Sequence, residues 1–161
     1  MDSRVPTLIA VEGASDKRVL ERIARRSGDS LDGVEIVAIG GAHAIRRFVG
    51  GLGSDVHVRG LCDENEAYLF ERVLDEVHVC RPDLEGELIR TLGVERVLSI
   101  VDTDAFAKMQ RQPHQRGRPV ELQLHRWLRS SSIRFYRYLD ELVDALELDR
   151  LPTPLQQVLW P

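Results

Sequence analysis

Short apolar runs alternate with segments of helical periodicity through the first half of the chain. The apolar runs are four to seven residues long and lie at residues 7–11, 34–39, 56–62 and 77–80. The segments that follow them predict helices at residues 13–26, 42–53, 64–76 and 83–93. Strands and helices that alternate at such short intervals are typical of parallel βαβ units. The pattern therefore predicts an α/β fold.

The first helix shows this periodicity clearly. Its apolar residues Val19, Leu20, Ile23 and Ala24 form one stripe at helical spacing. Ser15 precedes the stripe and is predicted to cap the N-terminus of the helix.

The strand pattern stops after about residue 94, and only helical patterns follow. Residues 118–129 have Pro119 in a first helical turn, and residues 153–159 have Thr153 as a predicted cap before Pro154. Between them, one predicted apolar side comprises Ile133, Tyr136, Leu139, Val143 and Leu146. We predict one domain, with an α/β core over residues 1–104 and a helical extension over residues 105–161 packed on that core.

The composition is that of a soluble globular protein. The chain has 161 residues, of which 43% are hydrophobic and 30% charged. Its first ten residues lack the apolar run of a signal peptide, and no run approaches the length of a membrane span. Cys62 and Cys80 fit neither a disulfide framework nor a zinc pattern, so buried free thiols are expected. We therefore expect a cytoplasmic location and no membrane association.

Charge is distributed unevenly along the chain. The net charge is −4, but residues 63–87 carry a net charge of −7 and residues 108–137 a net charge of +7. The distribution of charge, an acidic block followed by a basic block, is more informative about function than the small net charge. Solvated helix faces are the alternative for most of these side chains.

Acidic residues follow three of the predicted strands. Glu12 follows the first and Asp63 the third, while Asp83, Glu85 and Glu87 follow the fourth. The carboxyl ends of parallel strands lie at one edge of a sheet, where open α/β folds place their sites. Carboxylates that share a small volume raise each other's pKa, and a hard cation such as Mg²⁺ relieves the conflict. The sequence therefore predicts a metal site at this edge.

Glycines support this geometry, although individual acids have other interpretations. Gly13 is expected to allow a sharp turn after Glu12, and residues 40–41 (Gly-Gly) to allow close backbone approach at the same edge. An acid after a strand is commonly a helix cap or a solvated loop residue. That alternative stays open for Asp16, Glu64 and Glu87.

An ordered set of motifs resembles the Toprim domain of topoisomerases, bacterial primases and overcoming-lysogenization-defect (OLD) nucleases. The motifs are "VEGASD", "GG", "GLCDENE" and "RPDLEGELIRTLG". The segments "QRQPHQRGRPVELQLHRWL" and "LVDALELDRLPTPL" resemble the helical tail of small stand-alone Toprim proteins of the OLD type, described as nucleotidyl transferase/hydrolase domains. The resemblance covers nearly the whole chain.

The resemblance implies a Rossmann-like, parallel four-stranded sheet flanked by helices, with Mg²⁺ or Mn²⁺ held by acids. It implies a catalytic set of Glu12, Asp63 and Glu85. The wider set of implied metal ligands is Glu12, Asp16, Asp63, Glu66, Asp83 and Glu85.

Two positions depart from the pattern of similar proteins. Asn65 stands where an Asp-x-Asp motif has its second aspartate, and Glu66 is expected to substitute for that aspartate. Phe135 stands where similar proteins tend to have a lysine, between the basic residues Arg134 and Arg137. These departures support an alternative, a non-catalytic Toprim-fold module that binds nucleic acid or protein through a degenerate metal site.

The basic block suits contact with phosphates. Arg116, Arg118, Arg134 and Arg137 are predicted to bind the backbone of DNA or RNA, with salt-sensitive affinity and no sequence preference. Ion pairs with the acidic block are the alternative for each arginine. Among the interleaved aromatic residues, Trp127 and Tyr136 are predicted to lie in the core. Assistance in proton transfer is one interpretation of His114 and His125, although a lone histidine in a basic helix usually has no chemical role.

The leading hypothesis is a Mg²⁺- or Mn²⁺-dependent endonuclease that hydrolyses phosphodiester bonds. A receiver-like or nucleotide-binding α/β domain ranks last, because the chain has neither a Walker lysine loop nor a Gly-x-Gly-x-x-Gly turn. OLD nucleases usually carry an ATPase domain, so a separate ATPase partner is a further expectation. A homodimer is compatible with the sequence.

Overall fold

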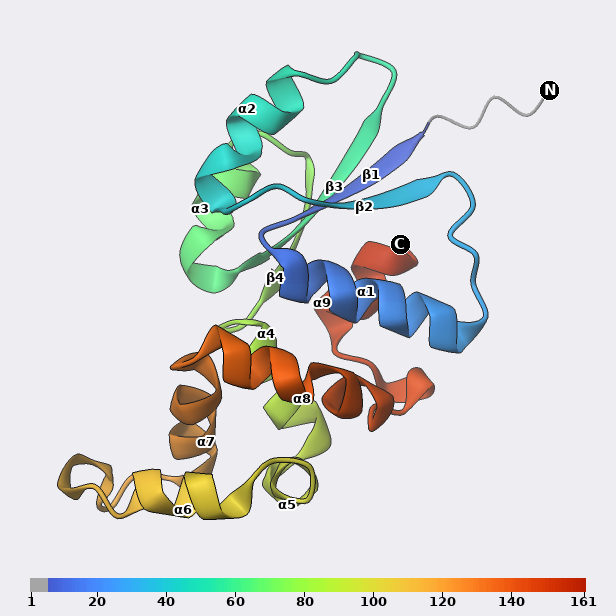
Figure 1. Ribbon diagram of the computed structural model, residues 1–161. Coiled ribbons are helices and arrows are strands. Elements are labelled where there is room, and N and C mark those ends of the chain that lie inside the picture. Colours follow the sequence, from blue (N-terminus) through green and yellow to red (C-terminus); the bar gives the residue numbers. More distant parts are fainter. Residues whose placement is uncertain (1–5) are drawn as a thin grey trace.

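A parallel sheet of four strands forms the centre of the computed structural model, which describes residues 6–161 (Figure 1). The strands are β1 (Thr7–Val11), β2 (Val34–Ala38), β3 (His57–Asp63) and β4 (Glu76–Cys80). They lie in the order β2-β1-β3-β4. The α/β fold with a parallel four-stranded sheet is therefore confirmed. Residues 1–5, part of the segment that lacks a signal-peptide pattern, lie outside the described residues.

The strand register brings three carboxyl ends to one edge of the sheet. Val11 is opposite Leu61, and Asp63 is opposite Cys80. Glu12 therefore leaves β1 one residue after Val11, beside the end of β3. Gly41 also reaches this edge, where its N–H donates to the carbonyl oxygen of Glu12 at 2.9 Å.

Helices cover both faces of the sheet (Figure 1). On one face, α1 (Ala14–Ser27) and α9 (Thr153–Leu159) pack with much of the C-terminal half in the larger hydrophobic core. On the other face, η1 (Ala42–Ala44), α2 (Ile45–Gly50), η2 (Glu64–Glu66) and α3 (Ala67–Glu71) lie over a smaller core.

The C-terminal half of the described chain is helical, as predicted. It comprises α4 (Leu84–Leu92), α5 (Val94–Leu98), α6 (Thr103–Gln110), η3 (Pro113–Gln115), α7 (Val120–Arg129), α8 (Ser132–Asp144), η4 (Leu148–Arg150) and α9. Its buried residues join those of the sheet in one continuous hydrophobic cluster. The division of the chain at residue 104 stays a prediction.

Ion pairs fix α8 against α1. Arg18 donates two hydrogen bonds to the carboxylate of Asp140, and Arg22 donates two to that of Asp144. One turn further on, Arg26 donates to the carbonyl oxygens at the end of α8. Basic residues at i, i+4 and i+8 on one helix thus meet the acidic end of the other, which positions α8 beside the sheet edge.

Two predicted helix caps are wrong. Gly13, and not Ser15, caps α1, because the Asp16 carboxylate accepts the Gly13 N–H at 2.9 Å. Gly13 has an ordinary extended φ of −139°, so the turn after Glu12 does not require glycine. Pro152, and not Thr153, precedes the first turn of α9.

The predicted apolar side of residues 133–148 is partly wrong. Ile133 is 77% exposed and Tyr136 is 43% exposed, whereas Leu139 and Val143 are buried as predicted. Phe135 is buried in their place. The buried face of α8 (Ser132–Asp144) runs through Phe135, Leu139 and Leu142 at i, i+4 and i+7 spacing, and Ile133 and Tyr136 lie outside that stripe.

Other expectations about the core are confirmed. Trp127, Cys62 and Cys80 are buried, and both cysteines are free thiols. Burial raises the pKa of the Cys62 thiol to about 12, with nearby carboxylates adding to the shift. No helix within residues 6–161 is long and apolar enough to cross a membrane.

Candidate functional site

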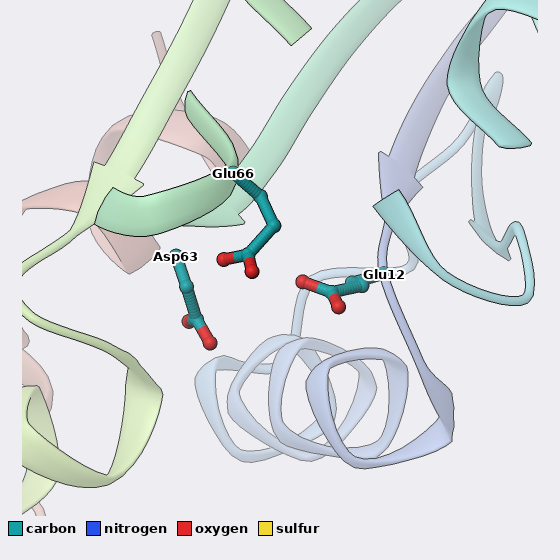
Figure 2. Close-up of side chains that lie close together, drawn as sticks. All are labelled: Glu12, Asp63 and Glu66. Atoms are coloured by element: carbon teal, nitrogen blue, oxygen red, sulfur yellow. The ribbon is translucent and has the colours of Figure 1, made fainter. Parts of the chain in front are cut away.

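Three carboxylates converge at the carboxyl edge of the sheet. Glu12 follows β1, Asp63 is the last residue of β3, and Glu66 ends the η2 turn after it. One carboxylate oxygen from each residue lies within 4.8 Å of those from the other two. Figure 2 shows the three side chains pointing toward one another from separate elements. The structure thus brings Glu66, the residue after Asn65, beside Glu12 and Asp63.

Burial and neighbouring acids raise the pKa of Glu12 and of Asp63. Burial, followed by the charge of Glu66, raises the pKa of Glu12, while the charge of Arg129 acts in the opposite direction. Burial raises the pKa of Asp63 to about 8, with nearby acids, Asp16 first among them, adding to the shift. A site that is so unfavourable to anions is one that a cation would stabilise strongly.

The trio fits a hard divalent cation. Mg²⁺ and Mn²⁺ prefer carboxylate oxygens, and Mg²⁺ keeps several waters in its coordination shell. One oxygen of Glu66, Oε2, is buried and has no hydrogen-bond partner within residues 6–161. A buried acceptor of this kind is costly unless a ligand satisfies it, and a metal ion would do so. An acidic metal centre is therefore compatible with the geometry, although the identity of the ion stays a prediction.

Two of the remaining predicted acids, Asp16 and Glu85, line a pocket of about 210 Å³. Its lining includes Glu12, Asp16, Asp63 and Glu85. Burial raises the pKa of Asp16 to about 6 although that carboxylate accepts the Gly13 N–H, and burial also raises the pKa of Glu85. Glu85 thus borders the same space without joining the Glu12–Asp63–Glu66 trio.

Asp83 has a different environment from the other acids. It is fully buried, and as the N-cap of α4 it accepts the Gly86 N–H at 2.8 Å. His125 lies 2.8 Å from one of its oxygens, and Arg129 donates to the other. Both carboxylate oxygens of Asp83 therefore have partners within the protein. Through them, Asp83 holds two side chains of α7 in place.

Arg129 reaches from this anchor into the acidic pocket. It lines the same pocket as Glu12, Asp63 and Glu85, together with Ser132 and Phe135 of α8. Its charge partly opposes the burial that raises the pKa of both Glu12 and Glu85. Within the described chain, Arg129 is the single basic residue of the pocket lining. The acidic pocket thus combines several carboxylates with one guanidinium.

Sequence reasoning missed the contacts of Arg129 and His125 with Asp83. The available signal was their i, i+4 spacing in α7, which puts both side chains on one helix face. In the sequence, their partner Asp83 is one of several acids that follow the fourth strand. Burial separates it from the others, and burial is not visible in the local sequence.

The Asp83–His125 pair predicts a pH dependence of stability. Burial raises the pKa of Asp83, but hydrogen bonds from His125 and Gly86 outweigh it and leave a lowered pKa. The pKa of His125 is raised, chiefly by its hydrogen bond to Asp83. The pair's contribution to folding stability is lost as the pH falls through the pKa of Asp83. It is also lost as the pH rises through the pKa of His125. We expect the cost of His125→Gln, measured by urea unfolding, to be greatest between about pH 4 and 6.5; an equal cost from pH 3 to 9 would refute the pairing.

Metal-free protein should gain stability from Asp63→Asn. Asparagine keeps the oxygen that accepts the Leu84 N–H and removes a charge that burial disfavours. We expect a gain of about 1–2 kcal/mol in chelator at pH 8, limited by the partial exposure of the group. The gain should shrink toward pH 4, because wild-type Asp63 then holds its proton in the folded state. Asp75→Asn, at an exposed acid, is the control; an Asp63→Asn protein no more stable than this control would contradict the prediction.

The four arginines predicted to bind nucleic acid occupy different environments. Arg116 and Arg137 are exposed, and Arg118 is half-buried. Arg134 donates to the carbonyl oxygen of Trp127 at 2.6 Å, and its guanidinium lies over the indole ring. None of the four forms an ion pair with a carboxylate of residues 6–161. Their contact with nucleic acid stays a prediction.

Solved structures share this fold. The C-terminal region of the Xanthomonas campestris pv. campestris OLD protein matches 98% of this chain and 94% of its own, with a TM-score of 0.65 and 17% identity. The C-terminal region of the Burkholderia pseudomallei OLD protein matches 97% of this chain and 96% of its own, with a TM-score of 0.62 and 18% identity. No protein-family model matches the chain, and no curated protein sequence does so either. The chain therefore has the fold of the C-terminal region of OLD proteins, and the resemblance to OLD-type Toprim proteins is confirmed at the level of the fold.

Proposed function

We propose that this protein hydrolyses phosphodiester bonds of nucleic acid in a divalent-metal-dependent reaction. The observation that carries the proposal is the convergence of Glu12, Asp63 and Glu66 within 4.8 Å at the carboxyl edge of a parallel sheet. Acids held this closely, with a basic side chain across the pocket, match the needs of metal-assisted phosphoryl chemistry. The fold shared with OLD C-terminal regions is consistent with this proposal.

The acids at this edge of the sheet would have two separate roles. Glu12, Asp63 and Glu66 would hold Mg²⁺ or Mn²⁺, which supplies an activated water and stabilises charge on the phosphate and the leaving oxygen. Glu85 and Asp16 line the same pocket, and their raised pKa values suit them to accept or hold a proton near the reacting group.

Arg129 provides the positive charge that Phe135 cannot. Phe135 is buried and lines the pocket without charge, whereas Arg129 enters the same pocket from α7. Its tether to the buried Asp83 holds the guanidinium in place before substrate binds. A planar guanidinium held in this way can donate two hydrogen bonds to a phosphate. Arg129 would then supply the positive charge of the missing lysine, and Glu66 would supply the carboxylate that Asn65 lacks.

Nicking of a supercoiled plasmid tests the proposal. Purified protein should relax the plasmid in Mg²⁺ or Mn²⁺ and leave it supercoiled in excess chelator. Labelled single-stranded DNA and RNA in the same assay would define the substrate. Intact substrates under all these conditions would refute the enzyme; binding without cleavage would instead support the non-catalytic module. A separate ATPase partner and a homodimer stay predictions.

A further inference from the structure

A second hollow, of about 570 Å³, lies in the helical extension between α6, η3 and α7 and the start of α8. Its basic residues are Lys108, Arg126 and Arg134, with His114 beside them. The part of the chain that the structure describes contributes no carboxylate to its lining. By contrast, the hollow between α5 and the end of α8 combines Arg96 and Arg150 with Glu147.

The positive charge of this basic hollow is free to meet a ligand. Within residues 6–161, neither Lys108 nor Arg126 has a carboxylate within 4.0 Å, and both are exposed. Arg134 is held in place by the carbonyl oxygen of Trp127 and by Ser130 Oγ at 2.9 Å. Both bonds come from one nitrogen, so the other guanidinium donors stay available. The hollow thus combines two exposed cations without a carboxylate partner in residues 6–161 and one cation held by hydrogen bonds.

The basic hollow adjoins the acidic pocket through the junction of α7 and α8. Arg129 and Ser132 line the acidic pocket, whereas Arg126 and Ser130 line the basic hollow. Arg126 and Arg129 are about one helical turn, or ~5 Å, apart along α7. A nucleic-acid strand with one phosphate in the acidic pocket would therefore pass close to the basic hollow.

We propose that the basic hollow binds the backbone phosphates of the nucleic-acid strand that flank the phosphate in the acidic pocket. This inference rests on the proposed function and extends it, because it assigns Lys108 and Arg126 to substrate binding outside the reacting centre. Contacts of this kind give affinity and register but no sequence preference. They act on substrate binding and leave the chemical step to the acidic pocket.

A double variant, Lys108→Gln with Arg126→Gln, tests the proposal. Binding of a fluorescein-labelled, mixed-sequence single-stranded DNA 20-mer would be measured by anisotropy in chelator, over a range of salt concentrations. We expect the dissociation constant to rise at least tenfold at 100 mM salt, and the slope of log K against log salt to shrink by about 1.4. In the cleavage assay, KM should rise while kcat stays near that of wild type.

The control is Arg96→Gln with Arg150→Gln, which removes the same charge from exposed sites in the hollow that contains Glu147. This control should bind the 20-mer like wild type. Unchanged binding by the Lys108/Arg126 variant, an equal loss in the control, or no binding by wild type would overturn the proposal. Failure of the proposed function is distinguishable: wild type would then bind the 20-mer in the predicted way and leave it uncut in Mn²⁺.

Discussion

Replacing Glu12 with glutamine is expected to lower the rate of metal-dependent cleavage at least ~1,000-fold. Glu12 is one of three carboxylates whose oxygens lie within 4.8 Å of each other, and glutamine keeps its size while removing its charge. Loss of the metal's charge stabilisation, which is worth several kcal/mol, accounts for an effect of this size. Single-turnover cleavage of a labelled strand in Mn²⁺ measures it.

Glu64→Gln is the matched control for this variant. Glu64 lies in the same η2 turn as Glu66, but it is exposed and pairs with Arg81 at 2.6 Å. The same chemical change there should leave the cleavage rate within about twofold of wild type, because exposed ion pairs contribute little. Equal rates for Glu12→Gln and wild type would remove Glu12 from the reaction.

Replacing Arg129 with alanine is expected to lower kcat about 100- to 1,000-fold. Arg129 is the cation that lines the acidic pocket, and its bond to the buried Asp83 fixes its position. The loss of one oriented donor that stabilises developing negative charge typically has an effect of this size. KM should change far less than kcat, because the contact strengthens in the transition state.

Arg129→Lys distinguishes charge from shape at this position. Lysine keeps the charge but not the planar donors, so we expect kcat of Arg129→Lys to be about tenfold higher than that of Arg129→Ala. Arg96→Ala, at an exposed arginine of α5, serves as the control and should cleave like wild type. An Arg129→Ala protein that melts normally and cleaves at the wild-type rate would show that Arg129 does not contact the reacting phosphate.

The sheet could be predicted because its information is local. Each strand contains a short apolar run, and the parallel arrangement then brings the strand ends together. The convergence of Glu12 with Asp63 follows from that topology. The position of Glu66 follows as well, since it is three residues beyond the end of β3.

The helices and the basic side of the site were harder to predict. The helices α5 and α6 are short, and their stability comes from packing in the larger core more than from their own sequence. Phe135 is buried because it lies on the same face of α8 as Leu139 and Leu142, at i, i+4 and i+7 spacing. Arg129 enters the acidic pocket because a buried acid on another element holds it, a contact between residues 46 positions apart. Such long-range contacts leave little trace in the local sequence pattern.

Binding of Mn²⁺ to the metal-free protein is the most direct test of the carboxylate trio. Titration followed by electron paramagnetic resonance distinguishes free Mn²⁺, which gives a six-line signal, from bound Mn²⁺. We predict that wild-type protein suppresses the free signal in a saturable way, and that Asp63→Asn combined with Glu66→Gln does not. An undiminished free signal with wild-type protein, or equal suppression by the double variant, would contradict a metal centre at Glu12, Asp63 and Glu66.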